Sequence, residues 1–87
     1  MLEEFVGVKV VIDLQSPYVC LGTLLAIHDH FLELKQADPH DLRDTQTTRE
    51  NYVVAAVHTG IKKNRKRVLV ARRDIVAISR LDEVIDR

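Results

Sequence analysis

The chain has 87 residues, and its 13 lysines and arginines balance its 13 aspartates and glutamates, so the formal net charge is zero. This length predicts a single domain over residues 1–87 with a limited core, and neutrality excludes the strongly basic balance typical of a nucleic-acid-binding protein. No apolar run approaches the ~20 residues of a membrane-spanning helix, and the single Cys20 excludes an internal disulfide, so we expect a cytoplasmic protein without membrane contact.

The first predicted elements are a short helical turn and a strand. Residues 2–5 suit a helical turn, since Glu3 and Glu4 lie at the favourable positive end of a helix dipole. Apolar residues then recur at a spacing of two over residues 6–14, which predicts a strand with one buried face. The strand should end at residues 15–17, where a proline suits a turn.

Two further strands are predicted by the next apolar runs. Residues 18–28 are apolar on both faces, as in a strand covered on two sides, and Gly22 permits a sharp bend or a close approach of another backbone. Residues 31–36 alternate, with Leu32 and Leu34 on one face. We expect Cys20, among apolar neighbours, to be a buried and unreactive thiol.

The middle of the chain predicts a loop followed by a helix. Residues 37–46 are polar, contain a proline and have no period, which indicates a loop. Thr47 and Glu50 have the spacing of a capping box, with Thr47 as the cap, and Gly60 stands where a helix C-terminal glycine belongs. These two signals predict a helix over about residues 48–59.

The rival interpretation of this segment is a strand, because residues 52–54 are rich in strand-forming side chains. The separation of the two end signals favours the helix. Such a helix is apolar nearly all round and should therefore be buried. We expect one face to pack on the sheet and the remainder to lie at a subunit interface.

The remaining segments predict two more strands. Residues 61–66 form a basic connector, residues 67–72 alternate as a strand, and residues 72–74 make a tight connection. Residues 75–79 form a last apolar strand, and residues 81–87 add a strand end or a helical turn. The whole predicts a mainly β fold: a small, strongly bent, five-stranded antiparallel barrel of SH3-like type, with one inserted helix between the third and fourth strands.

Over half of the basic residues fall in one short segment, so a positive patch survives the neutral total. As a functional feature, this patch would bind phosphates with a strong dependence on salt. As a structural feature, it would be a solvated loop that keeps a strand edge from aggregating. The patch comprises Lys62, Lys63, Arg65, Lys66 and Arg67, followed by Arg72 and Arg73.

Two stretches resemble signatures of the Sm-like family, whose members form rings that bind RNA. Gly22 followed by residues 29–34, DHFLEL, resembles the family's strand with an inner glycine and its Asp-x-aromatic motif. Residues 71–73, ARR, resemble the Ile-Arg-Gly turn between the last two strands. The sequence departs from the family in Glu33, where an asparagine is usual, in Arg73, where a glycine is usual, and in a longer middle segment.

The resemblance implies a non-catalytic RNA-binding protein that forms a homo-oligomeric ring. Phe31 would stack on a base and Arg72 would close the stack, with Asp29, His30 and Arg73 close by. Glu33 would favour amino donors on a base or repel the phosphate backbone, because a carboxylate only accepts hydrogen bonds. The basic residues Lys62, Lys63, Arg65, Lys66 and Arg67 would contact phosphates on an outer face.

Two other functions remain open from the residues. The same small barrel could be a structural or protein–protein interaction module without nucleic acid, using the inserted helix. A metal site would need a third ligand beside His28 and His30, from Asp38, His40, Asp41 or His58, and we expect histidines near solvent instead. Enzyme motifs are absent from the sequence, so we expect neither catalysis nor a cofactor.

Overall fold

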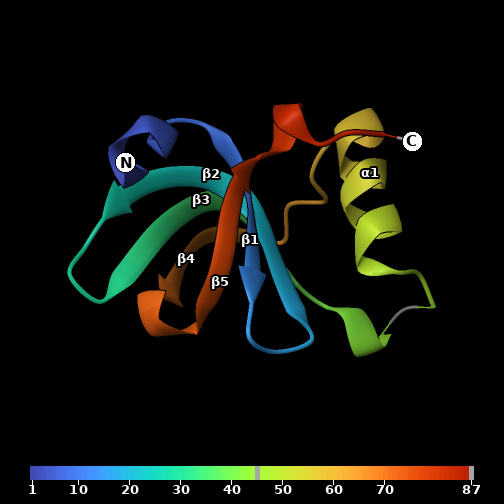
Figure 1. Cartoon of the computed structure of the whole chain (residues 1–87), viewed down its shortest axis with the longest axis horizontal. Coiled ribbons are helices and arrows are strands. Elements are labelled where there is room, and N and C mark those ends of the chain that lie inside the picture. Colours follow the sequence, from blue (N-terminus) through green and yellow to red (C-terminus); the bar gives the residue numbers. More distant parts are fainter. Residues whose placement is uncertain (45, 87) are drawn as a thin grey trace.

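The computed structural model describes residues 1–44 and 46–86, and its five strands form one antiparallel sheet in the order β4-β3-β2-β1-β5 (Figure 1). The sheet is strongly bent and its edge strands β4 and β5 are not paired with each other, so the predicted barrel is open at this seam. The predicted mainly β arrangement of five antiparallel strands, with one helix inserted between the third and fourth strands, is thereby confirmed. The elements are η1 (Leu2–Phe5), β1 (Lys9–Leu14), β2 (Tyr18–Ile27), β3 (Phe31–Asp41), η2 (Leu42–Asp44), α1 (Arg49–Thr59), β4 (Arg65–Ala71), η3 (Arg72–Asp74), β5 (Ile75–Arg80) and η4 (Leu81–Glu83).

Apolar side chains pack on both faces of the sheet. Inside the bend, the buried cluster comprises Val10, Ile12, Cys20, Leu24, Leu32, Leu34, Ala37 and Val70. On the other face, α1 and η4 cover a second cluster of Val11, Val19, Leu21, Val53, Ala56 and Leu81. The first strand buries one face, and its other face is mixed, because Val11 packs in this second cluster while Lys9 is exposed.

Gly22 and Cys20 have the roles that the sequence predicts. A Cβ atom at Gly22 would lie 2.9 Å from the Cβ of Ala37 and 3.1 Å from a methyl carbon of Leu34, so β3 approaches β2 closely here. Cys20 is 1% exposed, and burial raises the pKa of its thiol to about 12. The thiol is therefore protonated and unreactive.

Strand β3 continues through Asp41, so the predicted loop over residues 37–46 was wrong for its first half. Pro39 is opposite Cys20 of β2, but β4 pairs with β3 only up to Ala37 and Arg65. Pro39 therefore lies where β3 is an edge strand and its missing N–H removes no ladder hydrogen bond on the outer side. Gln36, with φ of 51°, marks the irregularity before this extension.

Helix α1 spans Arg49–Thr59, as predicted, but its cap is Thr48 and not Thr47. The Thr48 hydroxyl accepts a hydrogen bond from the amide of Asn51 at 3.1 Å. At the other end, Gly60 has a φ of 86° and its amide donates to Ala56 O at 2.9 Å. The helix is not buried all round, since Val57 is 38% exposed.

The remaining boundaries differ from prediction by a few residues. β1 begins at Lys9 rather than Val6, because Gly7 adopts a φ of 83° that interrupts the extended backbone. β4 begins at Arg65, inside the predicted connector, and the chain after Arg80 forms a 3₁₀ turn at Leu81–Glu83. Thr45 of the predicted loop and Arg87 of the terminal segment lie outside the described residues.

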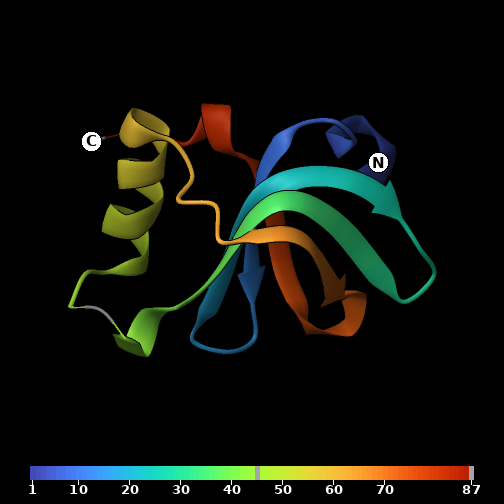
Figure 2. The ribbon, with the colours of Figure 1, turned by 180° about the vertical axis from the view of Figure 1, so that it is seen from behind.

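The two ends of the molecule are built differently. Helix α1 stands at one end, and the β2–β3 turn and η3 lie toward the other, as the front and back views both show (Figures 1 and 2). Within residues 1–44 and 46–86, no helix has the length and apolar character to cross a membrane.

Candidate nucleic-acid interface

A hollow of about 510 Å³ lies between the β2–β3 turn and η3, at the end away from α1. The register of β3 and β4 places the two sides of this hollow next to each other, because Phe31 at the start of β3 pairs with Ala71 at the end of β4. The amide of Arg72 then donates to His30 O at 2.9 Å, which ties η3 to the turn. The lining residues are Asp29, His30, Phe31, Ala71, Arg72 and Arg73.

An aromatic ring and guanidinium groups share this hollow. Phe31 is 43% exposed, although Leu32, the next residue of β3, is buried. Arg72 Nη1 donates to His28 O at 2.9 Å, so the guanidinium is held against the turn while its residue stays exposed. This arrangement offers a flat apolar surface and positive charge to the same ligand.

Glu33 is occupied by two neighbours within the protein. Its carboxylate contacts Arg67 Nε at 2.5 Å and His28 Nε2 at 2.8 Å, and its side chain is only 13% exposed. These contacts, with Arg67 first and His28 second, lower the pKa of Glu33, so it is ionised at neutral pH. The negative charge that we expected to face a base or phosphate is therefore paired with Arg67.

The predicted basic patch is divided by the fold. Lys62 and Lys63 line a different hollow, beside α1. Arg65 donates to Asn64 O at 3.1 Å, and Arg67 is paired with Glu33. Lys66 is exposed on β4, so the members of the segment have different surroundings.

The histidines considered as metal ligands lie in separate contacts. His28 is paired with Glu33, and His58 lies 2.5 Å from Asp86. Across residues 1–44 and 46–86, no group of three or more His, Cys, Asp and Glu side chains could hold a metal ion.

Two participants in this region were missed at the sequence level. His28 fixes both Glu33, through its ring, and Arg72, through its carbonyl oxygen. Ala71 lines the hollow directly beside Phe31. The strand register that joins them spans some 40 residues of sequence, and no local spacing signals it.

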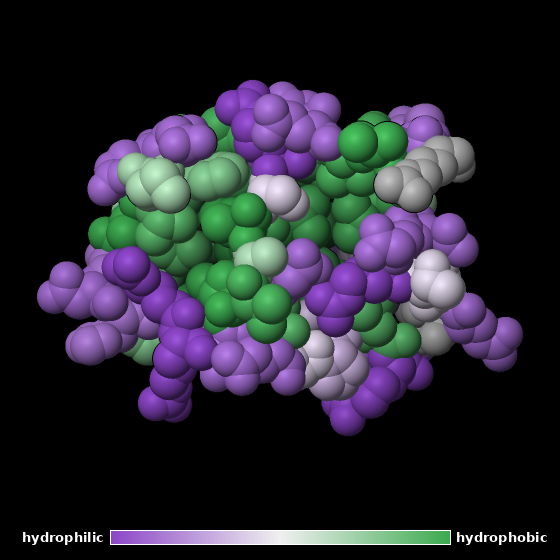
Figure 3. Space-filling model, in the orientation of Figure 1, coloured by the Kyte–Doolittle hydropathy of each residue, from purple (hydrophilic) through white to green (hydrophobic). Residues whose placement is uncertain are grey.

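The edge strands carry exposed apolar side chains. Leu69 of β4 is 45% exposed and Val76 of β5 is 65% exposed. Unpaired edges with apolar side chains favour pairing with another chain. In the space-filling view, apolar surface spreads over the region of β5 and η1 (Figure 3).

Comparison with solved structures identifies this architecture. An Sm protein of Pyrococcus abyssii, solved in complex with a uridine heptamer, is 15% identical, with a TM-score of 0.61 over 91% of this chain and 90% of that chain. A heptameric archaeal Sm protein is 19% identical, with a TM-score of 0.59 over 91% and 93%. The chain has a divergent Sm-like fold.

A second kind of protein, a chain of the NatC complex, is also similar in fold. A chain of the NatC complex bound to CoA is 19% identical, with a TM-score of 0.58 over 100% of this chain and 86% of that chain. No protein-family model and no curated protein sequence matches the chain. At these identities the likeness concerns the Sm-like fold, and function has to be argued from the site.

Proposed function

We propose that this Sm-like protein binds single-stranded RNA without catalysing a reaction and assembles from copies of itself into a ring. The observation that carries the proposal is the half-exposed Phe31 in one hollow with Arg72 and Arg73. The similar Sm protein solved with a uridine heptamer shows that this fold accommodates RNA. From the sequence we further propose a cytoplasmic location, since a single cysteine fits a reducing compartment.

In the proposed complex, a base stacks on Phe31 and the Arg72 guanidinium covers it from η3. Stacking of one base on an aromatic side chain contributes roughly 1–3 kcal/mol. The hydrogen bond from Arg72 to His28 O orients the guanidinium before RNA arrives, which reduces the entropy lost on binding. Glu33 opposes phosphate little, because Arg67 neutralises it.

The proposed ring follows from the open edges of the sheet. Pairing of β4 in one copy with β5 in the next satisfies backbone groups that the single chain leaves unpaired, and it covers Leu69 and Val76. A similar Sm protein is heptameric. Light scattering during size-exclusion chromatography tests this step, and a strict monomer at micromolar concentration would contradict it.

A binding titration tests the RNA function. Fluorescence anisotropy with a labelled single-stranded uridine oligonucleotide should show saturable binding by the native chain. Arg72→Ala should weaken it, whereas Arg43→Ala should not, since Arg43 is exposed and paired with Asp41 far from the hollow. Equal affinities for both variants would remove Arg72 from the site.

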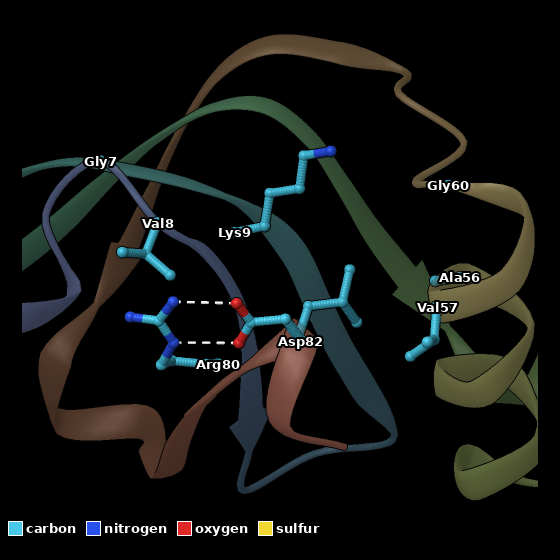
Figure 4. Close-up of a pocket in the computed structure, with 9 residues that line it drawn as sticks. Gly7, Val8, Lys9, Ala56, Val57, Gly60, Arg80 and Asp82 are labelled. Atoms are coloured by element: carbon cyan, nitrogen blue, oxygen red, sulfur yellow. Dashed lines mark hydrogen bonds and ion pairs between the residues drawn. The ribbon is translucent and has the colours of Figure 1, made fainter. Parts of the chain in front are cut away.

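A second candidate function is protein–protein interaction through the α1 end. A hollow of about 530 Å³ lies between Val8, Val57 and Leu81, with the Arg80–Asp82 ion pair on its rim (Figure 4). The similarity to a chain of the NatC complex favours this candidate. Absence of RNA binding combined with a monomeric chain would favour it over the ring.

A further inference from the structure

A third hollow, of about 620 Å³, lies between the end of β3, α1 and the connector to β4. It is separate from the candidate RNA interface, because its walls are α1 and the connector rather than the β2–β3 turn and η3. The chemistry-bearing side chains that line it are Asp38, His40, Asn51, Tyr52, Lys62 and Lys63.

A buried carboxylate lies at the base of this hollow. Asp38 is 3% exposed, and its Oδ1 accepts a hydrogen bond from Asn64 Nδ2 at 3.0 Å. Among residues 1–44 and 46–86 it forms no salt bridge. Burial raises its pKa, and the nearby His40, Lys62 and Arg65 together with the hydrogen bond from Asn64 offset this effect only in part. It therefore retains capacity to accept hydrogen bonds from a ligand.

An aromatic pair forms another wall. The rings of His40 and Tyr52 stack with centroids 4.1 Å apart and planes 9° from parallel. His40 Nε2 is buried and has no hydrogen-bond partner within the described part of the chain. Buried polar atoms are usually paired, so this nitrogen indicates that the polar wall is incomplete without a ligand or water.

Positive charge stands at the rim. Lys62 and Lys63 are both exposed and line the hollow with the carboxylate below them. The site thus accepts hydrogen bonds at its base and attracts an anion at its mouth. A ligand that matches both must carry adjacent N–H donors on a flat ring and a negative group away from that ring.

We propose that this hollow binds a guanine nucleotide. The N1–H and N2–H groups of guanine form two neighbouring donors that one carboxylate accepts together, and the Asp38 carboxylate, which lines the hollow, would accept them. The phosphate lies toward Lys62 and Lys63, and the base lies beside the His40–Tyr52 pair. Adenine, cytosine and uracil lack two adjacent donors on this edge, so the carboxylate discriminates against them.

Isothermal titration of the full chain with GMP, AMP and UMP tests this proposal. GMP should bind at least about tenfold more tightly than AMP or UMP, the ratio expected when a charged hydrogen-bonding partner is matched rather than left unpaired. Guanosine should bind more weakly than GMP, because it lacks the phosphate.

Variants separate ligand recognition from folding. Asp38→Asn keeps an oxygen for Asn64 but presents an amide N–H to the base, so GMP binding should fall at least about tenfold while the unfolding temperature is retained. The double variant Lys62→Ala/Lys63→Ala should weaken GMP but leave guanosine unchanged. Lys35→Ala, an exposed lysine on β3 outside the hollow, is the matched control.

Three results would overturn the proposal: no binding of GMP, equal binding of GMP and AMP, or an unchanged GMP affinity in a folded Asp38→Asn variant. Competition between GMP and a guanine-containing single strand shows whether the base comes from a free nucleotide or from RNA. A uridine oligonucleotide tests the hollow at the β2–β3 turn separately, so failure with GMP leaves the RNA proposal standing.

Discussion

The two ends of this small sheet each hold a carboxylate, and the pKa values of these two carboxylates are shifted in opposite directions. At the β2–β3 end, Glu33 is paired with Arg67 and His28, which lowers its pKa. At the α1 end, burial raises the pKa of Asp38, although a hydrogen bond from the Asn64 amide acts in the opposite direction. Both residues lie on β3, five positions apart. The surroundings that the fold gives each carboxylate, rather than its local sequence, set the direction of its pKa shift.

Consequently the ends suit different ligands. With Glu33 neutralised, the hollow around Phe31 presents an aromatic ring and the exposed cationic side chains of Arg72 and Arg73. Asp38 forms no salt bridge with the described residues. The hollow beside α1 therefore presents its carboxylate as a hydrogen-bond acceptor beneath two lysines. We expect stacking and charge to dominate at the first end and hydrogen bonding at the second.

The largest expected effect compares two exposed aromatic residues. Phe31 is 43% exposed and Tyr18 is 39% exposed, but only Phe31 lines the hollow with Arg72. Phe31→Ala should weaken RNA binding by about 5- to 140-fold, which corresponds to losing roughly 1–3 kcal/mol of stacking. Tyr18→Ala should change the anisotropy titration little. Equal losses for the two variants would place RNA elsewhere.

The next effect compares two carboxylates in stability. Asp38→Ala removes the acceptor of the Asn64 amide and should lower the free energy of unfolding by about 0.5–1.5 kcal/mol, the usual net contribution of one hydrogen bond, because Asn64 is exposed and water can replace its partner. Asp29→Ala, in the exposed turn, should change it by less than about 0.5 kcal/mol. Urea denaturation of both variants measures the difference. If Asp29→Ala were the more damaging variant, the contrast in burial would not govern stability.

A smaller effect appears in the dependence of stability on pH. Because the pKa of Glu33 is lowered on folding, its stabilising contribution is present above its unfolded value of 4.5 and is lost as pH falls. The pKa of Asp38 is raised, so its ionisation opposes folding as pH rises above 3.8.

Variants that lack the charge of Glu33 or of Asp38 measure how each ionisation changes stability with pH. Relative to the native chain, Glu33→Gln should be less stable at neutral pH, and this deficit should shrink on acidification. Asp38→Asn should gain relative stability as pH rises from acidic to neutral values. Thermal unfolding across this range gives both curves, and parallel curves for the two variants would remove the proposed contrast.

The smallest effect concerns salt. Exposed Arg72 and Arg73 should make RNA affinity fall as salt rises, with a log–log slope of roughly −0.7 for each phosphate contact on a single strand. Arg73→Ala should make that slope shallower, whereas Arg67→Ala should change it less, because Arg67 is paired with Glu33. A steeper slope change for Arg67 would mean that the pair opens on binding.

The sequence predicted what depends on local pattern. Alternation and apolar runs identified the five strands, the end signals identified α1, and the motif around Phe31 and Arg72 identified side chains that the fold brings together. The extension of β3 through Pro39 was missed, because proline predicts a loop unless the neighbouring strand is known to end first.

The fate of the basic segment could not be predicted for a related reason. Arg67 of β4 pairs with Glu33 of β3, which is 34 residues away in the chain. Lys62 and Lys63 lie beside α1, before β4 begins. The cap assignment missed by one residue, since Thr47 and Thr48 are adjacent and either can cap a helix.

Ultraviolet crosslinking is the most direct test of the proposal that RNA lies at the β2–β3 turn and η3. A single-stranded uridine oligonucleotide should be crosslinked to the native chain and the attachment points mapped by mass spectrometry. We expect the oligonucleotide to be attached at residues 29–31 and 71–73. Crosslinks confined to α1 and the connector at residues 60–64, with none at Phe31, would contradict it.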